Sequence, residues 1–153
     1  MSDMSEERHY VEENARELER MRALVRRLGD DELSSRVNDR WTVAGVLAHI
    51  AFWDARNLVL AEKLERSVPF SPSDDEPEDV DWINDSTRPF IHAIEPREAA
   101  ELSLRLAEET DARMASLPPD RMYPADPANP INPLRATHRG EHLDDVEAAL
   151  AQS

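Results

Sequence analysis

The chain has 153 residues, 40% of them hydrophobic and 33% charged, enough for one domain. Its net charge of −15 argues against a nucleic-acid partner, because phosphate binding needs a basic face, and disfavours adsorption to anionic membranes. Cysteine is absent, which excludes disulfides, thiolate metal ligands and a cysteine nucleophile. Any metal ion must therefore be held by histidine and carboxylate, and any thiol must be supplied by a small molecule.

The composition favours helices and a soluble protein. The chain has only three glycines and 5% aromatic residues, while alanine, leucine, glutamate and arginine are frequent. No apolar run approaches the length of a membrane span, and the N-terminal sequence MSDMSEERHY is too polar for a signal peptide. We therefore expect a single cytoplasmic domain covering residues 1–153.

Two amphipathic helices are predicted in the first half of the chain. Apolar residues recur three and four positions apart over residues 5–28 and again over residues 43–66, with a polar connection at 31–35. Thr42 is suited to cap the second helix. His49 falls inside the second apolar stripe. Because an unpaired polar group in a core is costly, His49 should be either hydrogen-bonded or bound to metal.

The middle of the chain alternates between irregular and helical segments. Three prolines and a run of acids predict a loop over 67–79, followed by a short helical stretch from residue 80 that breaks before Pro89. His92 is predicted to be a surface loop residue, as His9 is predicted to be solvated near the start of the first helix. A third long helix is expected from about residue 96 to residue 117.

The last helix is predicted to follow an irregular crossover. Residues 118–133 contain six prolines, and Asn132-Pro133 is a suitable helix start. The four long helices together predict an all-α four-helix bundle. Gly140 inside the last helix is unfavourable and suggests close approach of another element. One face of this helix is expected to carry Leu134, His138, His142, Val146 and Leu150.

His138 and His142 lie four residues apart, so their Cβ atoms are expected about 5–6 Å apart on one helix face. Both imidazoles can then reach one metal ion. The alternative is a core in which histidines only hydrogen-bond one another. Glu141 and Asp145 can orient an imidazole or act as a base, although a solvated helix face is the simpler interpretation.

The pattern Trp41-Thr42-x-x-x-Val46-x-x-His49-Ile50-Ala51-x-Trp53, followed by His138-x-x-x-His142-Leu143, resembles the DinB-like superfamily. The resemblance implies an up-down-down-up four-helix bundle that is often a homodimer. It also implies one divalent metal ion held by a histidine of the second helix and two of the fourth. By position these ligands are His49, His138 and His142. The acidic loop and the proline-rich crossover depart from the family pattern and are expected to border the pocket.

Three imidazoles leave coordination positions free, which is typical of catalytic rather than structural sites. We expect zinc or nickel, with iron or manganese as alternatives. An open position can activate water or deprotonate a thiol. The sequence alone assigns no catalytic or thiol-binding residue.

Three functions remain open. The resemblance implies an enzyme that activates a low-molecular-weight thiol, as in thiol-dependent S-transferases and mycothiol-dependent maleylpyruvate isomerases. Lys63 is the only lysine, and this arginine bias suggests a GC-rich bacterial source in which mycothiol is plausible. The alternatives are a hydrolase that uses metal-bound hydroxide and a non-catalytic bundle. The non-catalytic bundle would bind a small ligand, or a partner protein through the acidic residues 74–76.

Overall fold

The computed structural model describes residues 8–152, and within this part of the chain the protein is all-α, as predicted. The described residues form six α-helices and two short 3₁₀ helices, with no β-strand among them. In chain order these are α2 (His9–Arg27), α3 (Asp30–Ser34), α4 (Val43–Glu65), η1 (Pro72–Asp74), α5 (Asp81–His92), α6 (Pro96–Ser116), η2 (Pro119–Arg121) and α7 (Ala136–Ala151).

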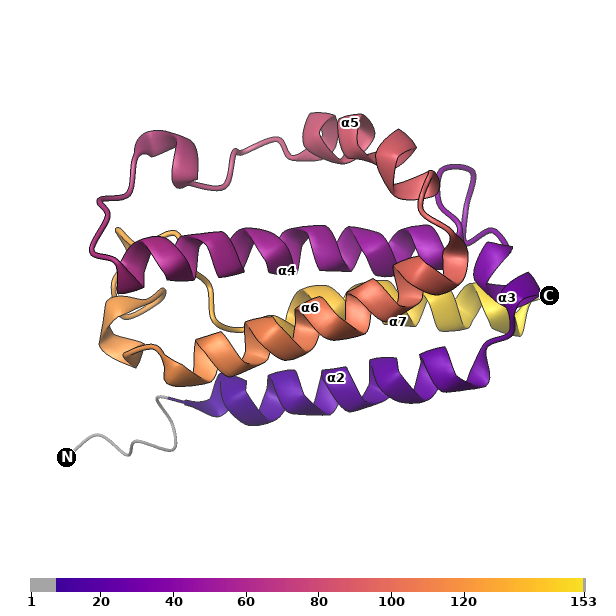
Figure 1. Ribbon diagram of the computed structural model, residues 1–153, viewed down its shortest axis with the longest axis horizontal. Helices are drawn as coiled ribbons and strands as arrows, with labels where there is room; N and C mark the ends of the chain where they lie inside the picture. Colours follow the sequence, from indigo (N-terminus) through magenta and orange to yellow (C-terminus); the bar gives the residue numbers. More distant parts are fainter. Residues whose placement is uncertain (1–7, 153) are drawn as a thin grey trace.

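The four long helices pack side by side (Figure 1). Helices α2 and α4 each contact both α6 and α7, so the four enclose a common core. Figure 1 shows α2 and α7 running in one direction and α4 and α6 in the other. The shorter α5 lies outside this group and packs on α4. The tertiary contacts therefore bring α4 and α7, which carry the candidate histidines, into direct contact.

Helix α4 is the central helix of the core, and it begins as the sequence predicts. Thr42 caps it, its hydroxyl oxygen accepting a hydrogen bond from the Gly45 backbone N–H at 3.0 Å. Contrary to the expectation that no apolar segment is long enough, α4 has the length and composition of a membrane span. It is, however, mostly buried among the other helices. Its apolar character is therefore explained by its place in the core.

In the first half of the chain one local prediction lies partly outside the described residues, and another was incomplete. The predicted start of the first helix at residue 5 lies outside the described residues, and α2 begins at His9. The connection predicted to be merely polar contains the short helix α3. Leu33 of α3 is fully buried against the main core, so one apolar contact within a polar stretch stabilises this helix.

The prediction that the helix after residue 80 breaks before Pro89 was wrong, because α5 continues through Pro89 to His92. Pro89 is exposed, so water can solvate the carbonyl that loses its intrahelical partner. Burial of Ile91 in the core offsets the remaining cost. His92 is exposed as predicted, but it ends a helix rather than lying in a loop.

The predicted start of the last helix at Asn132-Pro133 was also wrong, since α7 begins at Ala136. Asn14 of α2 explains the shift. Its side-chain oxygen accepts hydrogen bonds from the backbone N–H groups of Arg135 and Ala136 at 2.8 and 2.9 Å. Its amide nitrogen donates to the Pro133 carbonyl at 2.7 Å. A residue more than a hundred positions away thus supplies the cap of α7.

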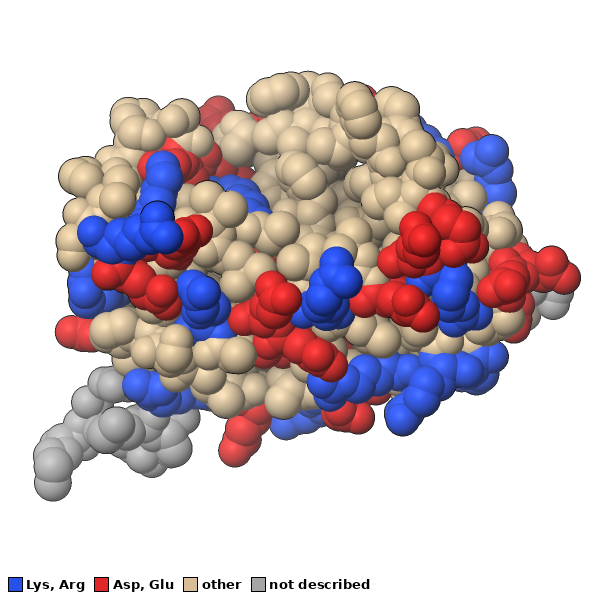
Figure 2. All heavy atoms as spheres, viewed as in Figure 1, with Lys and Arg blue, Asp and Glu red and all other residues tan. Residues whose placement is uncertain are grey.

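Charged side chains are interspersed on the face shown in Figure 2, where acidic and basic residues alternate over the long helices. The part of this face formed by α5 and its surroundings is mainly uncharged. On this face the acidic side chains are thus interspersed with basic ones rather than gathered in one patch.

Candidate metal centre

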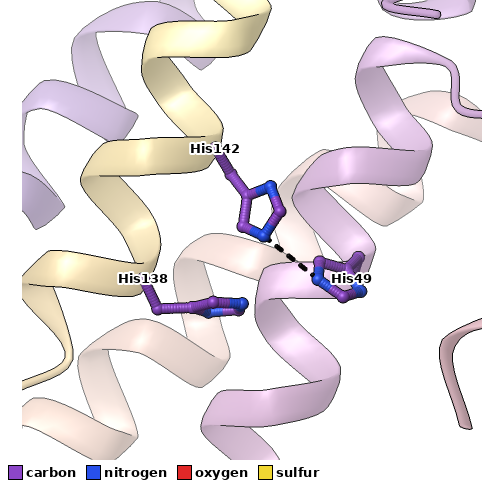
Figure 3. A group of neighbouring side chains, drawn as sticks. All are labelled: His49, His138 and His142. Carbon is purple, nitrogen blue, oxygen red and sulfur yellow. Dashed lines mark hydrogen bonds between the residues drawn. The ribbon is translucent and has the colours of Figure 1, made fainter. Parts of the chain in front are cut away.

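The structure brings together the three histidines that the sequence analysis selected (Figure 3). His49 projects from α4, and His138 and His142 project from successive turns of α7. One ring nitrogen of each lies within 4.8 Å of the others. The remaining two histidines, His9 and His92, are exposed and lie outside this cluster.

The spacing of the ring nitrogens suits a common metal ion. The Nε2 atoms of His49 and His142 are 3.2 Å apart. With zinc–nitrogen bonds of about 2.0–2.1 Å, two imidazoles of a tetrahedral site place their nitrogens about 3.3–3.4 Å apart. The all-nitrogen donor set suits zinc, nickel or iron rather than magnesium or calcium. The residues present therefore fit a transition-metal ion.

Burial keeps the three imidazoles neutral. Burial, together with the smaller effect of repulsion from His142, lowers the pKa of His49 to about 4 and that of His138 to about 2. Burial also lowers the pKa of His142, although the nearby carboxylates of Asp145 and Glu141 oppose this effect. Since only neutral imidazole binds a metal ion, the cluster is in its metal-binding state at neutral pH.

Hydrogen bonding among the histidines does not satisfy the cluster. A bond between His49 and His142 uses one nitrogen of each ring, and His138 makes no hydrogen bond within the described residues. The Nδ1 atoms of His49 and His138 are buried and lack a partner among the described residues. His138 is thus left without a partner if the cluster is held by hydrogen bonding alone, whereas a common metal ion would bind one nitrogen of all three rings.

The histidines form one wall of a cavity of about 380 Å³. The segment that follows η1 contributes Glu76 and Val80, and the crossover contributes Asn132 and Leu134. The prediction that these two irregular segments border the pocket is thus confirmed. Glu141 also lines the cavity, whereas Asp145 does not. A small molecule in this cavity would lie beside the histidines.

A buried network of charges next to the histidines was not predicted. Asp54 of α4 is fully buried and accepts hydrogen bonds from Arg135 at 3.0 Å and from Arg139 at 3.2 Å. Arg139 is 0% exposed and also donates two hydrogen bonds to Asp111 of α6, at 2.7 and 3.0 Å. The network therefore ties α7 to α4 and α6 beside the three histidines.

This network changes which face of α7 is buried. Of the face that was predicted to pack on the bundle, Val146 is fully buried and Leu150 packs on the core, but His138 and His142 are not among the fully buried positions. The other fully buried positions of α7 are Arg139 and Leu143. The histidines instead lie half-buried at the edge of the core, facing the cavity. The signal was present in the sequence, because Arg139 precedes Leu143 by four residues and Val146 by seven. A charged residue at such a position is, however, normally predicted to be exposed to solvent, so Arg139 was not predicted to be buried.

Gly140, between the two histidines of α7, is not required by a close backbone approach. A Cβ atom at this position would lie 3.6 Å from the Glu17 carboxyl group, which is an ordinary contact. We therefore expect Gly140→Ala to raise the free energy of unfolding by about 0.5–1 kcal/mol, through helix propensity and reduced freedom of the unfolded chain. Urea denaturation measures this difference.

Gly45 in α4 provides the matched control for Gly140. A Cβ atom at Gly45 would lie 2.5 Å from the His92 ring and 3.0 Å from the Thr42 hydroxyl oxygen. Gly45→Ala should therefore lack the gain in stability. Destabilisation by Gly140→Ala would show that contacts of α7 at this position are tighter than the structure indicates.

The fold and the site together define a class of protein: a helical bundle with one histidine of α4 and two of α7 facing a common cavity. The family model of the DinB superfamily matches residues 13–143, and the chain belongs to this superfamily. The resemblance stated from the sequence is thereby confirmed. No curated protein and no solved structure matches the chain significantly.

Proposed function

We propose that His49, His138 and His142 bind one divalent metal ion, and that the protein is an enzyme that activates a low-molecular-weight thiol. The observation that carries this proposal is the cluster itself. Three neutral imidazoles from two helices have ligand atoms within 4.8 Å of one another at the wall of a cavity. Zinc or nickel is the ion we favour, followed by iron or manganese.

The chemistry follows from the open coordination of such a site. A metal ion held by the three histidines would lower the pKa of a bound thiol and so supply a nucleophilic thiolate at neutral pH. The cavity beside the histidines is where the thiol and its electrophile would bind. Glu141 lines the same cavity and is the carboxylate that we propose accepts the thiol proton. In S-transfer the sulfur would form a bond to an electrophilic carbon, and the leaving group on that carbon would depart with its bonding electron pair. In an isomerisation the sulfur would add to a carbon–carbon double bond and be eliminated again after rotation about that bond.

Several finer assignments belong to the same proposal. The directions of the four long helices support the up-down-down-up arrangement. The arginine bias supports mycothiol as the thiol. We expect a cytoplasmic homodimer that acts on a small molecule and does not bind nucleic acid or membranes. Light scattering tests the dimer, and a monomeric mass would exclude it.

Elemental analysis of the purified protein tests the metal site. We expect about one equivalent of metal per chain in the wild type and less than about a tenth of that in His49→Ala and His142→Ala, since each removes a ligand. His9→Ala is the control, because His9 is an exposed histidine outside the cluster. Unchanged metal content in His49→Ala would refute the assignment.

Omission of the thiol tests the reaction class. The metal-loaded protein is incubated with electrophiles in the presence and absence of mycothiol. We expect turnover only with the thiol. Turnover in water alone, with a pH–rate limb near the pKa of bound water, would instead indicate a hydrolase. Metal binding without turnover in either condition would favour the non-catalytic bundle.

A further inference from the structure

Arg56 is a half-buried cation in the wall of the histidine cavity. It lies on α4, seven residues and thus about two turns beyond His49. Its guanidinium donates a hydrogen bond to the Asp74 backbone carbonyl at 2.6 Å and lies 6.0 Å from the Trp53 ring. Among the described residues no carboxylate lies within ion-pair distance of it. In a chain with 33 acidic and 18 basic residues, this is an unexpected place for an unpaired charge.

A second guanidinium lines the same cavity. Arg135 is mostly buried, and its Nε donates to Asp54, whose carboxylate is shared with Arg139. Burial lowers the pKa of Arg56, and repulsion from Arg135 lowers it further, although the acids of residues 74–76 oppose both effects. Glu76 and Glu141 line the cavity but are exposed, and neither forms an ion pair with Arg56 within the described residues. Arg56 and Arg135 therefore both line one cavity, and although Glu76 attracts Arg56 more strongly than Arg135 repels it, no carboxylate of the described residues is in direct contact with Arg56.

The cavity wall also contains an unused hydrogen-bond acceptor. Asn57 is 1% exposed, and its amide nitrogen donates to the Trp53 carbonyl at 3.1 Å, which fixes the orientation of the amide. Its Oδ1 atom is buried and has no partner among the described residues. Since buried acceptors in native structures are nearly always paired, a donor on a ligand is the partner expected here.

We propose that the histidine cavity recognises a carboxylate through Arg56 and Arg135, with Asn57 accepting a hydrogen bond from an adjacent N–H or O–H group. A carboxylate bound in the cavity supplies the direct ion-pair partner that Arg56 lacks within the described residues, and Arg135 adds a second positive charge at the same cavity wall. The substrate class is thus a small organic acid that carries a hydrogen-bond donor near its carboxylate. This inference rests on the proposed function for the metal-dependent reaction, but binding of the acid itself depends only on residues of the chain.

Isothermal titration calorimetry on the metal-free and zinc-loaded protein tests the proposal. The probe is N-acetylglycine, which carries a carboxylate next to an amide N–H, and the neutral comparison is its methyl ester. We expect both forms of the protein to bind the acid and neither to bind the ester comparably. Arg56→Gln should weaken binding of the acid about tenfold to a hundredfold, because hydrogen bonds to charged groups contribute about 1.5–3 kcal/mol.

Arg66→Gln is the matched control, since it removes the same charge from an exposed ion pair at the end of the same helix. Thr137→Asp keeps the test valid if Arg56→Gln fails to fold. Thr137 is an exposed residue of the cavity wall near the start of α7, so an added carboxylate there should weaken binding of the acid but not of the ester. Equal binding of acid and ester, or unchanged affinity in Arg56→Gln, would overturn the proposal.

The carboxylate can belong to the thiol or to the electrophile, and kinetics of the metal-loaded protein separates the two. Arg56→Gln should raise KM for the reactant that carries the carboxylate and leave the other KM unchanged. Failure of the proposed function would give a different result: the wild-type protein would bind no metal ion but would still bind N-acetylglycine. Retained metal binding with no preference for the acid over the ester would refute the carboxylate proposal and leave the proposed function standing.

Discussion

Replacement of Arg139 by methionine is expected to lower the free energy of unfolding by about 3–5 kcal/mol. Arg139 is fully buried between Asp54 and Asp111, to which it donates three hydrogen bonds. Methionine fills a similar volume but leaves Asp111 without its cation and Asp54 with Arg135 alone. The loss of stability therefore arises mainly because buried carboxylates lose their positively charged hydrogen-bond donor, and less because packing is lost.

Urea denaturation of the metal-free protein measures this effect, so that metal binding does not contribute. Arg113→Met serves as the control, because Arg113 also bridges two helices, α6 and α4 through Glu65, but does so at the surface. Exposed ion pairs contribute about 0–1 kcal/mol, so this variant should be nearly as stable as the wild type. A loss below about 1 kcal/mol in Arg139→Met would show that the network adds little to stability.

Acidification from pH 7 to pH 4 is expected to destabilise the metal-free protein by about 3 kcal/mol through His49 alone. The pKa of His49 in the folded protein is about 4, below the 6.5 of a free imidazole. The unfolded chain therefore binds a proton before the folded protein does, and the free energy of unfolding falls as the pH falls below about 6.5. His138, whose folded pKa is about 2, acts in the same direction over a wider range.

His49→Gln isolates this contribution from that of the carboxylates. Glutamine is neutral at both pH values, so the variant should lose less stability than the wild type between pH 7 and pH 4. Denaturation curves at a series of pH values give the difference. Bound zinc should protect the wild type, because metal and protons compete for the same nitrogens. Identical pH dependence of variant and wild type would show that His49 is not buried in its neutral form.

The site itself was predictable in part. The four-residue spacing of His138 and His142 indicated a shared helix face, and the resemblance to the superfamily added His49; the fold brings all three together. Arg56 and Asn57 were missed because nothing in their spacing sets them apart from other polar residues of a helix. Arg56 lacks a carboxylate partner, and the Asn57 side-chain oxygen lacks a hydrogen-bond donor. A missing partner can be recognised only when the positions of the neighbouring residues are known.

The sequence by itself determined the all-α class and the bounds of the two helices in which local signals agree. Apolar periodicity, the Thr42 cap and the prolines that flank residues 96–116 locate α4 and α6 to within a residue or two. These signals act between neighbours in the chain, which is why they can be read without the fold.

Only the tertiary structure decided how α7 begins and which way it faces. Its cap is Asn14 of another helix, and its inward position is Arg139, held by carboxylates of α4 and α6. From its residue type alone, Arg139 is expected to be exposed, because burying a charge is unfavourable unless oppositely charged partners are buried with it. That pairing turns His138 and His142 from the core to the cavity, where a metal ion and a substrate can reach them.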